Sequence, residues 1–191
     1  MVKQLVQYSL LLGAFVLPSA FPAFAQTSPQ ELVSQVKRAV VIVTTYDNQK
    51  KPLQQGSGFF ISSNRIVTNF HVVESAKEIR IKTFTGETVS VVTVVAKDRQ
   101  ADLAILQSAA PCRETSSLQV ANIFPATHES LVVVNNSKGP LWKVTVGKVA
   151  ATWNFEDLGT KMQITATLAP SSAGPVVHLQ GHMMGIAAMD R

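Results

Sequence analysis

From residue 40 onwards the sequence is a succession of short runs rich in β-branched and aromatic residues, separated by turn-forming residues. Many short strands at close spacing are typical of all-β sandwiches and barrels. The runs fall in two clusters, at about residues 40–107 and 129–191. We therefore expect two small antiparallel β-barrels, with an unrelated β-sandwich as the alternative. The predicted strands are 40–46, 58–61, 65–68, 78–82, 88–96 and 103–106 in the first cluster, and 131–134, 142–149, 162–165, 175–179 and 183–188 in the second.

One short helix is predicted immediately before the first strand. Ser28 is a favourable N-cap, Pro29 takes the first helical position, and Glu31 completes a capping box. Apolar residues follow at helical spacing, so the helix is expected to run through about Arg38 and to pack over one end of a barrel.

The first 25 residues have the pattern of a secretory signal peptide. Lys3 is followed by a largely apolar run over 5–17, Pro18 interrupts it, and small residues stand at 23 and 25. A membrane anchor is the rival interpretation, but the run is short and no stop-transfer pattern follows. We expect cleavage after Ala25, a mature domain over 26–191 that starts at Gln26, no membrane span after cleavage, and a secreted or periplasmic location.

The composition excludes several other classes. With 46% hydrophobic and 15% charged residues, the bulk of the chain is not disordered. The single cysteine, Cys112, excludes an internal disulfide framework and a cysteine-rich zinc site. The net charge is +5 without a run of five like charges, which argues against a nucleic-acid partner. No phosphate loop or metal motif is present, so we expect neither cofactor nor metal.

Three residues are candidates for nucleophilic catalysis. His71 follows a predicted strand, Asp102 precedes one, and Ser172 lies in a tight turn between two others. A serine hydroxyl needs an imidazole to accept its proton and a carboxylate to orient that imidazole, and the order His, Asp, Ser is a known triad order. Taken singly, each has a structural explanation as well: a packed histidine, a capping aspartate and a plain turn.

The segments around these residues carry a family resemblance. They are 56–61 (Gly-Ser-Gly-Phe-Phe-Ile), 66–73 (Ile-Val-Thr-Asn-Phe-His-Val-Val), 102–106 (Asp-Leu-Ala-Ile-Leu), 172–176 (Ser-Ala-Gly-Pro-Val) and 185–186 (Gly-Ile). Together they resemble the HtrA-like, or Deg-like, branch of the trypsin-like serine peptidases over roughly residues 30–189. The resemblance implies a chymotrypsin-type double β-barrel. It also implies that His71 is the general base, Asp102 its orienter and Ser172 the nucleophile.

Two of these assignments have a rival nearby. Asp98 competes with Asp102, and Ser171 competes with Ser172. The family pattern places the aspartate directly before Leu-Ala, which favours Asp102, and the Gly-Pro pair at 174–175 sets a register that favours Ser172.

The serine motif departs from the family pattern, which has glycine at positions 170 and 173. In that fold the oxyanion hole is formed by the backbone N–H groups of the serine and of the residue two before it. Pro170 has no N–H to donate, so the hole is expected to be defective, with Ser172 as its remaining donor. Losing one such donor typically costs about 10²–10³ in rate. Ala173 adds a methyl group to the same turn.

The resemblance also places the substrate pocket. Its base corresponds to Ala166 and Thr167, and one wall to Gly185, Ile186 and Ala187. Because no acidic residue stands at the base, small or medium apolar side chains are the expected preference at the cleaved position. The chain ends soon after this wall, so we expect the second barrel to be incomplete unless a partner or an earlier segment closes its edge.

Two functions therefore remain open. The first is a secreted or periplasmic serine endopeptidase with impaired turnover, acting on a peptide or protein substrate. The second is a catalytically inactive pseudo-peptidase that serves as a peptide- or protein-binding module. Retention of all three triad residue types favours the first, and Pro170, Ala173 and the short end favour the second. The sequence does not determine the oligomeric state.

Overall fold

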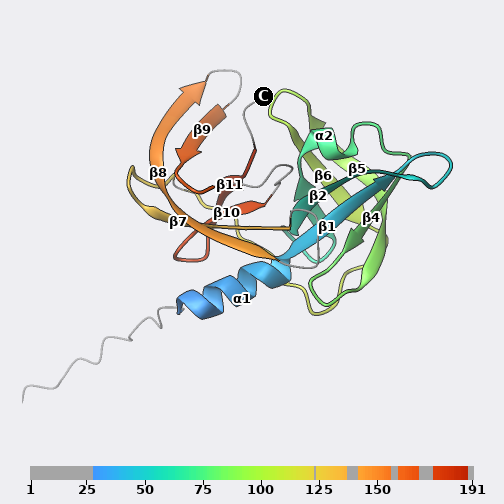
Figure 1. Ribbon diagram of the computed structural model, residues 1–191, viewed down its shortest axis with the longest axis horizontal. Helices are drawn as coiled ribbons and strands as arrows, with labels where there is room; N and C mark the ends of the chain where they lie inside the picture. The colour runs from blue at the N-terminus through green and yellow to red at the C-terminus, as the bar shows by residue number, and fades with distance from the viewer. Residues whose placement is uncertain (1–27, 123, 137–141, 156–158, 168–173, 189–191) are drawn as a thin grey trace, which may run out of the picture.

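The computed structural model describes residues 28–122, 124–136, 142–155, 159–167 and 174–188. A helix precedes a closed six-stranded barrel, which is followed by a five-stranded sheet. The barrel and the sheet lie side by side, with α1 below both (Figure 1). The expected pair of antiparallel barrels is confirmed, the second as an open half-barrel. The elements are α1 (Pro29–Ala39), β1 (Val40–Tyr46), β2 (Pro52–Phe60), β3 (Arg65–Thr68), α2 (Phe70–Val73), β4 (Glu78–Lys82), β5 (Thr88–Asp98), β6 (Leu103–Ser108), β7 (Ser130–Asn135), β8 (Lys143–Phe155), β9 (Gly159–Ile164), β10 (Pro175–His178) and β11 (Met183–Ile186).

Helix α1 begins at the predicted capping box. The Ser28 hydroxyl accepts the N–H of Glu31 at 3.2 Å, and the Glu31 carboxylate accepts the N–H of Ser28 at 2.9 Å. These hydrogen bonds lower the pKa of Glu31, chiefly through the Ser28 backbone. The helix buries one apolar stripe, formed by Leu32, Val36 and Ala39, and ends where β1 begins.

The first barrel is closed in the order β1-β2-β3-β6-β5-β4. Its strands alternate between a buried and a wetter face, as in β4, where Ile79 and Ile81 point inward. Gly58 on β2 has no room for a side chain, because a Cβ there would lie 2.8 Å from the carbonyl oxygen of Val67. The buried residues of the interior are Val41, Val43, Phe60, Ile66, Val72, Val73, Ile79, Ile81, Ala104, Leu106 and Cys112.

The second sheet has the order β11-β10-β7-β8-β9. Strand β7 is central, and Leu131 and Val133 point from it to the concave side, while Val132 and Val134 point towards α1. Among the described residues, β9 and β11 form its two edges. The buried residues of its interior are Leu131, Val133, Val149, Ala166, Val176 and Ala187.

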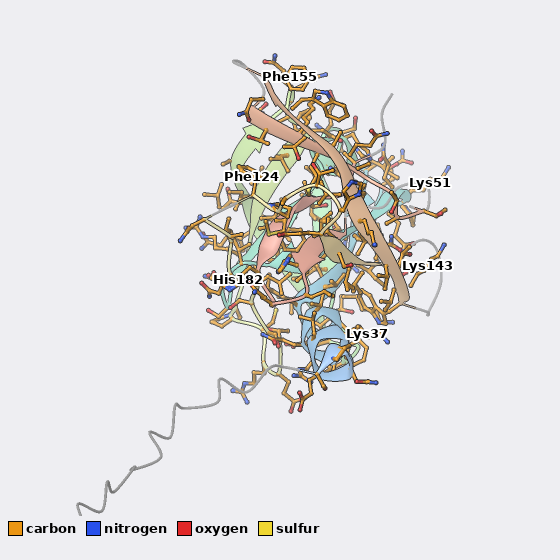
Figure 2. The ribbon with its side chains drawn as sticks, turned by 90° about the vertical axis from the view of Figure 1, so that its left-hand side faces the viewer. Lys37, Lys51, Phe124, Lys143, Phe155 and His182 are labelled. Carbon is orange, nitrogen blue, oxygen red and sulfur yellow. The ribbon has the colours of Figure 1, made fainter. Side chains whose placement is uncertain are left out.

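Strand β8 is longer than the rest of its sheet. Lys143 and Phe155 mark its two ends (Figure 2). Its first half pairs with β7 and its second half with β9, up to the pairing of Phe155 with Gly159. Most residues beyond Val149 are exposed, so the far part of β8 and β9 forms a two-stranded ribbon.

The two halves share an apolar joint on which α1 rests. Neighbouring residues of β2 point opposite ways: Phe60 into the barrel and Phe59 into the joint, where both are fully buried. A polar link lies beside it, because the Ser57 hydroxyl donates to the carbonyl of Asn136 at 3.1 Å and accepts its N–H at 3.0 Å. The buried residues of the joint are Leu32, Val36, Ala39, Val40, Phe59, Leu118, Val132, Val134, Val177 and Met183.

No helix within the described parts of the chain is both long and apolar enough to cross a membrane.

Candidate active site

His71 is held on α2, a helix of four residues that follows β3. Asn69 is extended before the helix, and Phe70 and Val72 on either side of the histidine are buried. Val72 packs against β2 so closely that a Cβ on Gly56 would lie 2.7 Å from it. The backbone of His71 is therefore fixed by its apolar neighbours, while its own side chain remains partly exposed.

Asp102 ends the turn between β5 and β6 in a left-handed backbone conformation, with φ at 53°. Its carbonyl oxygen accepts the N–H of Phe70 and the side-chain amide of Asn69, both at 3.1 Å. These bonds attach the turn directly to the segment that carries His71. Asn69, which is almost fully buried, was not among the sequence-based candidates, although it lies within the histidine motif.

The carboxylate of Asp102 contacts His71 through both oxygens. Oδ2 lies 2.7 Å from the ring Nδ1, and Oδ1 accepts the backbone N–H of His71 at 2.9 Å. A neutral imidazole that donates through Nδ1 carries its lone pair on Nε2. The side chains of His71 and Asp102 are 23% and 29% exposed, so this pair stands at the surface of the barrel, where a substrate can approach. The geometry suits a general base whose tautomer and orientation are set by a carboxylate.

Asp98, the rival carboxylate, has a different role. Its Oδ1 accepts the N–H groups of Gln100 and Ala101, each at 2.9 Å, and so shapes the turn that leads to Asp102. An ion pair between Arg99 and Glu74, with the Arg99 guanidinium also 5.2 Å from the Phe70 ring centroid, links this turn to α2.

The candidate nucleophile Ser172, its rival Ser171, and Pro170 and Ala173 lie outside the described residues. The chain is described again from Gly174, which lies against β7: a Cβ there would come within 2.4 Å of the Val134 carbonyl oxygen. Only glycine fits this close approach.

The comparisons with known proteins decide the family. Residues 56–186 match the family described as the trypsin-like peptidase domain. The chain belongs to this family.

Its relatives include proteins named as proteases and one that is not. The anti-sigma-I factor RsgI9 of Acetivibrio thermocellus is 28% identical over 78% of this chain and 21% of its own length. The periplasmic serine endoprotease DegP of Escherichia coli is 29% identical over 72% of this chain and 30% of its own length. A serine endoprotease structure from Yersinia pestis has a TM-score of 0.70 and 26% identity, over 84% of this chain and 57% of that one. The chain thus spans about a fifth to three fifths of the length of these relatives, and the last one supports the chymotrypsin-like double barrel.

The predicted pocket residues of this trypsin-like domain have different surroundings. Ala166 is buried against β8, where a Cβ on Gly147 would lie 2.5 Å from its nitrogen, and Thr167 is exposed. Gly185 and Ile186 face an apolar cavity of about 420 Å³ between β11 and the outer surface of the first barrel. Ala187 is buried in the half-barrel, with its N–H donating to the Gly174 carbonyl at 2.9 Å.

Two buried asparagines at the end of β7 were missed by sequence reasoning. Asn135 and Asn136 are 0% and 1% exposed, and among the residues that the structure describes no side-chain nitrogen or oxygen of either has a hydrogen-bond partner. A pair of polar residues directly after an apolar strand was the only signal available.

Proposed function

We propose that this chain is the peptidase domain of a serine endopeptidase in which His71, Asp102 and Ser172 form the catalytic triad. The observation that carries the proposal is the contact of the Asp102 carboxylate with the ring and backbone nitrogens of His71. Ser171 is the less favoured nucleophile, because the family motif has its serine two residues before a Gly-Pro pair, and the pair at 174–175 places Ser172 at that position.

In the proposed reaction, the Ser172 hydroxyl oxygen bonds to the carbonyl carbon of the substrate, and its proton passes to Nε2 of His71. The carbonyl π electrons move onto the oxygen, which becomes an oxyanion. Asp102 stays ionised and stabilises the imidazolium. The imidazolium then protonates the leaving amine, the C–N bond breaks, and water hydrolyses the acyl-enzyme by the same proton transfers in reverse.

The substrate of this domain is proposed to be a peptide or protein with a small or medium apolar residue at the cleaved position. Ala166 and Thr167 offer no negative charge for a lysine or arginine side chain, and apolar groups surround Gly185 and Ile186. An extended substrate would pair with β11, which is an edge among the described strands.

Export is part of the proposal. Residues 1–25 are proposed to be a signal peptide and residues 26–191 the exported domain, placed in the periplasm or secreted. The sequence pattern supports this, as do relatives named periplasmic endoproteases. Mass spectrometry of the exported protein should find Gln26 at its N-terminus, and an exported chain that retains residues 1–25 would contradict the signal peptide.

The alternative is a pseudo-peptidase that binds a peptide or protein without cleaving it. Pro170 and Ala173 favour it, because both alter the serine motif. A relative named as an anti-sigma factor adds support, since that name describes a regulator.

Labelling by a fluorophosphonate separates the two functions. We expect the purified protein to be labelled covalently, and Ser172→Ala and His71→Ala each to abolish labelling while the thermal unfolding curve is retained. Ser171→Ala is the matched control and should label like the wild type. A folded wild-type protein that takes up no label would reject the peptidase and favour the binding module.

A further inference from the structure

Asn69 stands at the N-cap of α2, but its side chain makes no capping hydrogen bond with that helix. An N-cap asparagine ordinarily accepts the N–H of the second or third helical residue through its side-chain oxygen. Here the second residue is His71, and its N–H is accepted at 2.9 Å by Oδ1 of Asp102, 31 residues farther along the chain. The capping role has thus passed to Asp102, while the Asn69 side chain is buried beside it.

The amide of Asn69 instead holds the backbone of Asp102. Its Nδ2 donates to the Asp102 carbonyl oxygen at 3.1 Å. Because a carbonyl oxygen can only accept, the atom that faces it must be the amide nitrogen. The backbone N–H of Phe70 donates to the same oxygen, also at 3.1 Å. Two donors from consecutive residues therefore converge on one carbonyl, and Asn69 is the one that contributes a side chain.

The backbone of Asp102 in turn decides where its carboxylate lies. With φ at 53°, Asp102 is in the left-handed region, which non-glycine residues adopt infrequently. In this conformation its carbonyl faces Asn69 and Phe70, while its two carboxylate oxygens contact the ring and backbone nitrogens of His71. The carbonyl and the side chain are attached to the same Cα, so a rotation that releases the carbonyl also displaces the carboxylate.

We propose that Asn69 is a positioning residue for the catalytic base: its amide holds the Asp102 backbone so that the carboxylate stays on Nδ1 of His71. The inference rests on the proposed peptidase function, in which His71 takes up the proton. Asn69 acts through Asp102 and transfers no proton itself.

The first test is the substitution Asn69→Leu, which removes the donor and keeps its approximate volume. The fluorophosphonate labelling rate should fall by about 10², the loss that a displacement of about 1 Å in a catalytic arrangement can cause. Asn69→Asp also keeps the shape without the N–H donor, and it should lose as much. It replaces the leucine variant if that variant does not fold.

Thr68→Val is the matched control. The Thr68 hydroxyl is also buried, and it donates to the backbone carbonyl of Ser57 at 2.7 Å. Valine therefore removes the same kind of hydrogen bond one residue earlier in the chain, without touching Asp102. We expect this variant to label at the wild-type rate, even where its thermal unfolding midpoint falls as far as that of Asn69→Leu.

The tautomer of His71 is a second readout, which a loss of stability alone does not change. The chain has four histidines, so ¹⁵N NMR of the histidine-labelled protein can assign the His71 ring by its absence in His71→Ala. The neutral ring of the wild type should carry its proton on Nδ1, as should that of Thr68→Val. Asn69→Leu should give a mixture with the Nε2-protonated form. This measurement requires no catalysis.

A double variant shows whether Asn69 acts through Asp102. If it does, Asn69→Leu should lower the labelling rate much less in an Asp102→Asn background than in the wild type, because the two residues then share one effect. A full additional loss in that background would overturn the positioning role.

The outcomes separate this inference from the function on which it rests. A folded wild type that takes up no label, but whose Nδ1 tautomer is lost in Asn69→Leu, would reject the peptidase and retain the positioning of Asp102. A labelled wild type whose rate and tautomer both survive in Asn69→Leu would reject the positioning role alone. Equal losses in Thr68→Val would also reject it, because any buried hydrogen bond of this segment would then serve.

Discussion

At the scale of single residues, the site depends on the backbone of Asp102. A non-glycine residue with φ at 53° is unfavourable for most side chains, but aspartate and asparagine tolerate it. This conformation lets one residue contact α2 through its carbonyl and both carboxylate oxygens. The identity of the residue is therefore constrained twice, by the turn and by the imidazole.

Asp102→Asn should separate these two constraints. Asparagine keeps the left-handed turn, so the free energy of unfolding should change little. It removes the charge and leaves His71 in the wrong tautomer, which should lower the fluorophosphonate labelling rate by about 10⁴. Asp98→Asn is the control, because an asparagine oxygen can still accept the two N–H groups of the turn. Equal losses in both variants would show that Asp102 acts through the turn alone.

The thiol of the single cysteine is packed among apolar side chains. Cys112 is buried in the interior of the first barrel, and burial, followed by the charge of Glu87, raises the pKa of its thiol. Because the thiolate is the reactive form, Cys112 should react with a disulfide reagent far more slowly in the folded protein than in denaturant. The absorbance of the released thiol measures both rates. Similar rates in the two states would place the thiol at the surface.

At the scale of elements, local signals located α1 and most strands. The capping box, the β-branched runs and their alternation depend on neighbours in sequence, and the predicted β1, β3 and β4 match the observed bounds. Helix α2 was not predicted, because four residues provide no helical period. Strands β2 and β8 were predicted too short, since most of the additional residues are exposed and are held by pairing with β1 and β9.

Ser28→Ala should destabilise α1 by about 1 kcal/mol, measured by chemical denaturation, because one N-terminal N–H loses its acceptor. The pKa of Glu31 is lowered in the folded state, so its contribution is present above the ordinary glutamate pKa of 4.5 and is lost as the pH falls through the folded-state value. Alanine keeps the backbone N–H that chiefly lowers this pKa, so most of the loss of stability in acid should persist in Ser28→Ala, and the difference between wild type and variant should change little with pH. A variant as stable as the wild type at neutral pH would contradict the capping role.

At the scale of the whole molecule, the two halves are held by the apolar joint around α1. Phe59 links them, because it belongs to the first barrel through β2 and packs with residues of β7 and β10. Beside it, the two hydrogen bonds between the Ser57 hydroxyl and the Asn136 backbone fix the position of β2 relative to the end of β7. The relative position of His71 and the Gly174 segment follows from this joint.

Phe59→Ala should lower the free energy of unfolding by about 3–5 kcal/mol, because it leaves a cavity in the joint. Phe124→Ala is the control: this side chain is exposed, and its loss should cost at most about 0.5 kcal/mol. Denaturant unfolding followed by tryptophan fluorescence measures both. A small effect of Phe59→Ala would mean that the halves are held elsewhere.

Alternation, capping and motif spacing are local properties of the chain, so most of the strands, helix α1 and the family motifs could be predicted from the residues alone. The tertiary structure decided which carboxylate meets His71: Asp98 and Asp102 are equivalent as residue types, and the fold brings together groups 31 residues apart. It also buried Ala187, and it placed the Asn135 side chain beside Gly174 with no hydrogen-bond partner in the described part of the chain. Such contacts depend on strand register and on how the halves pack, which no local pattern encodes.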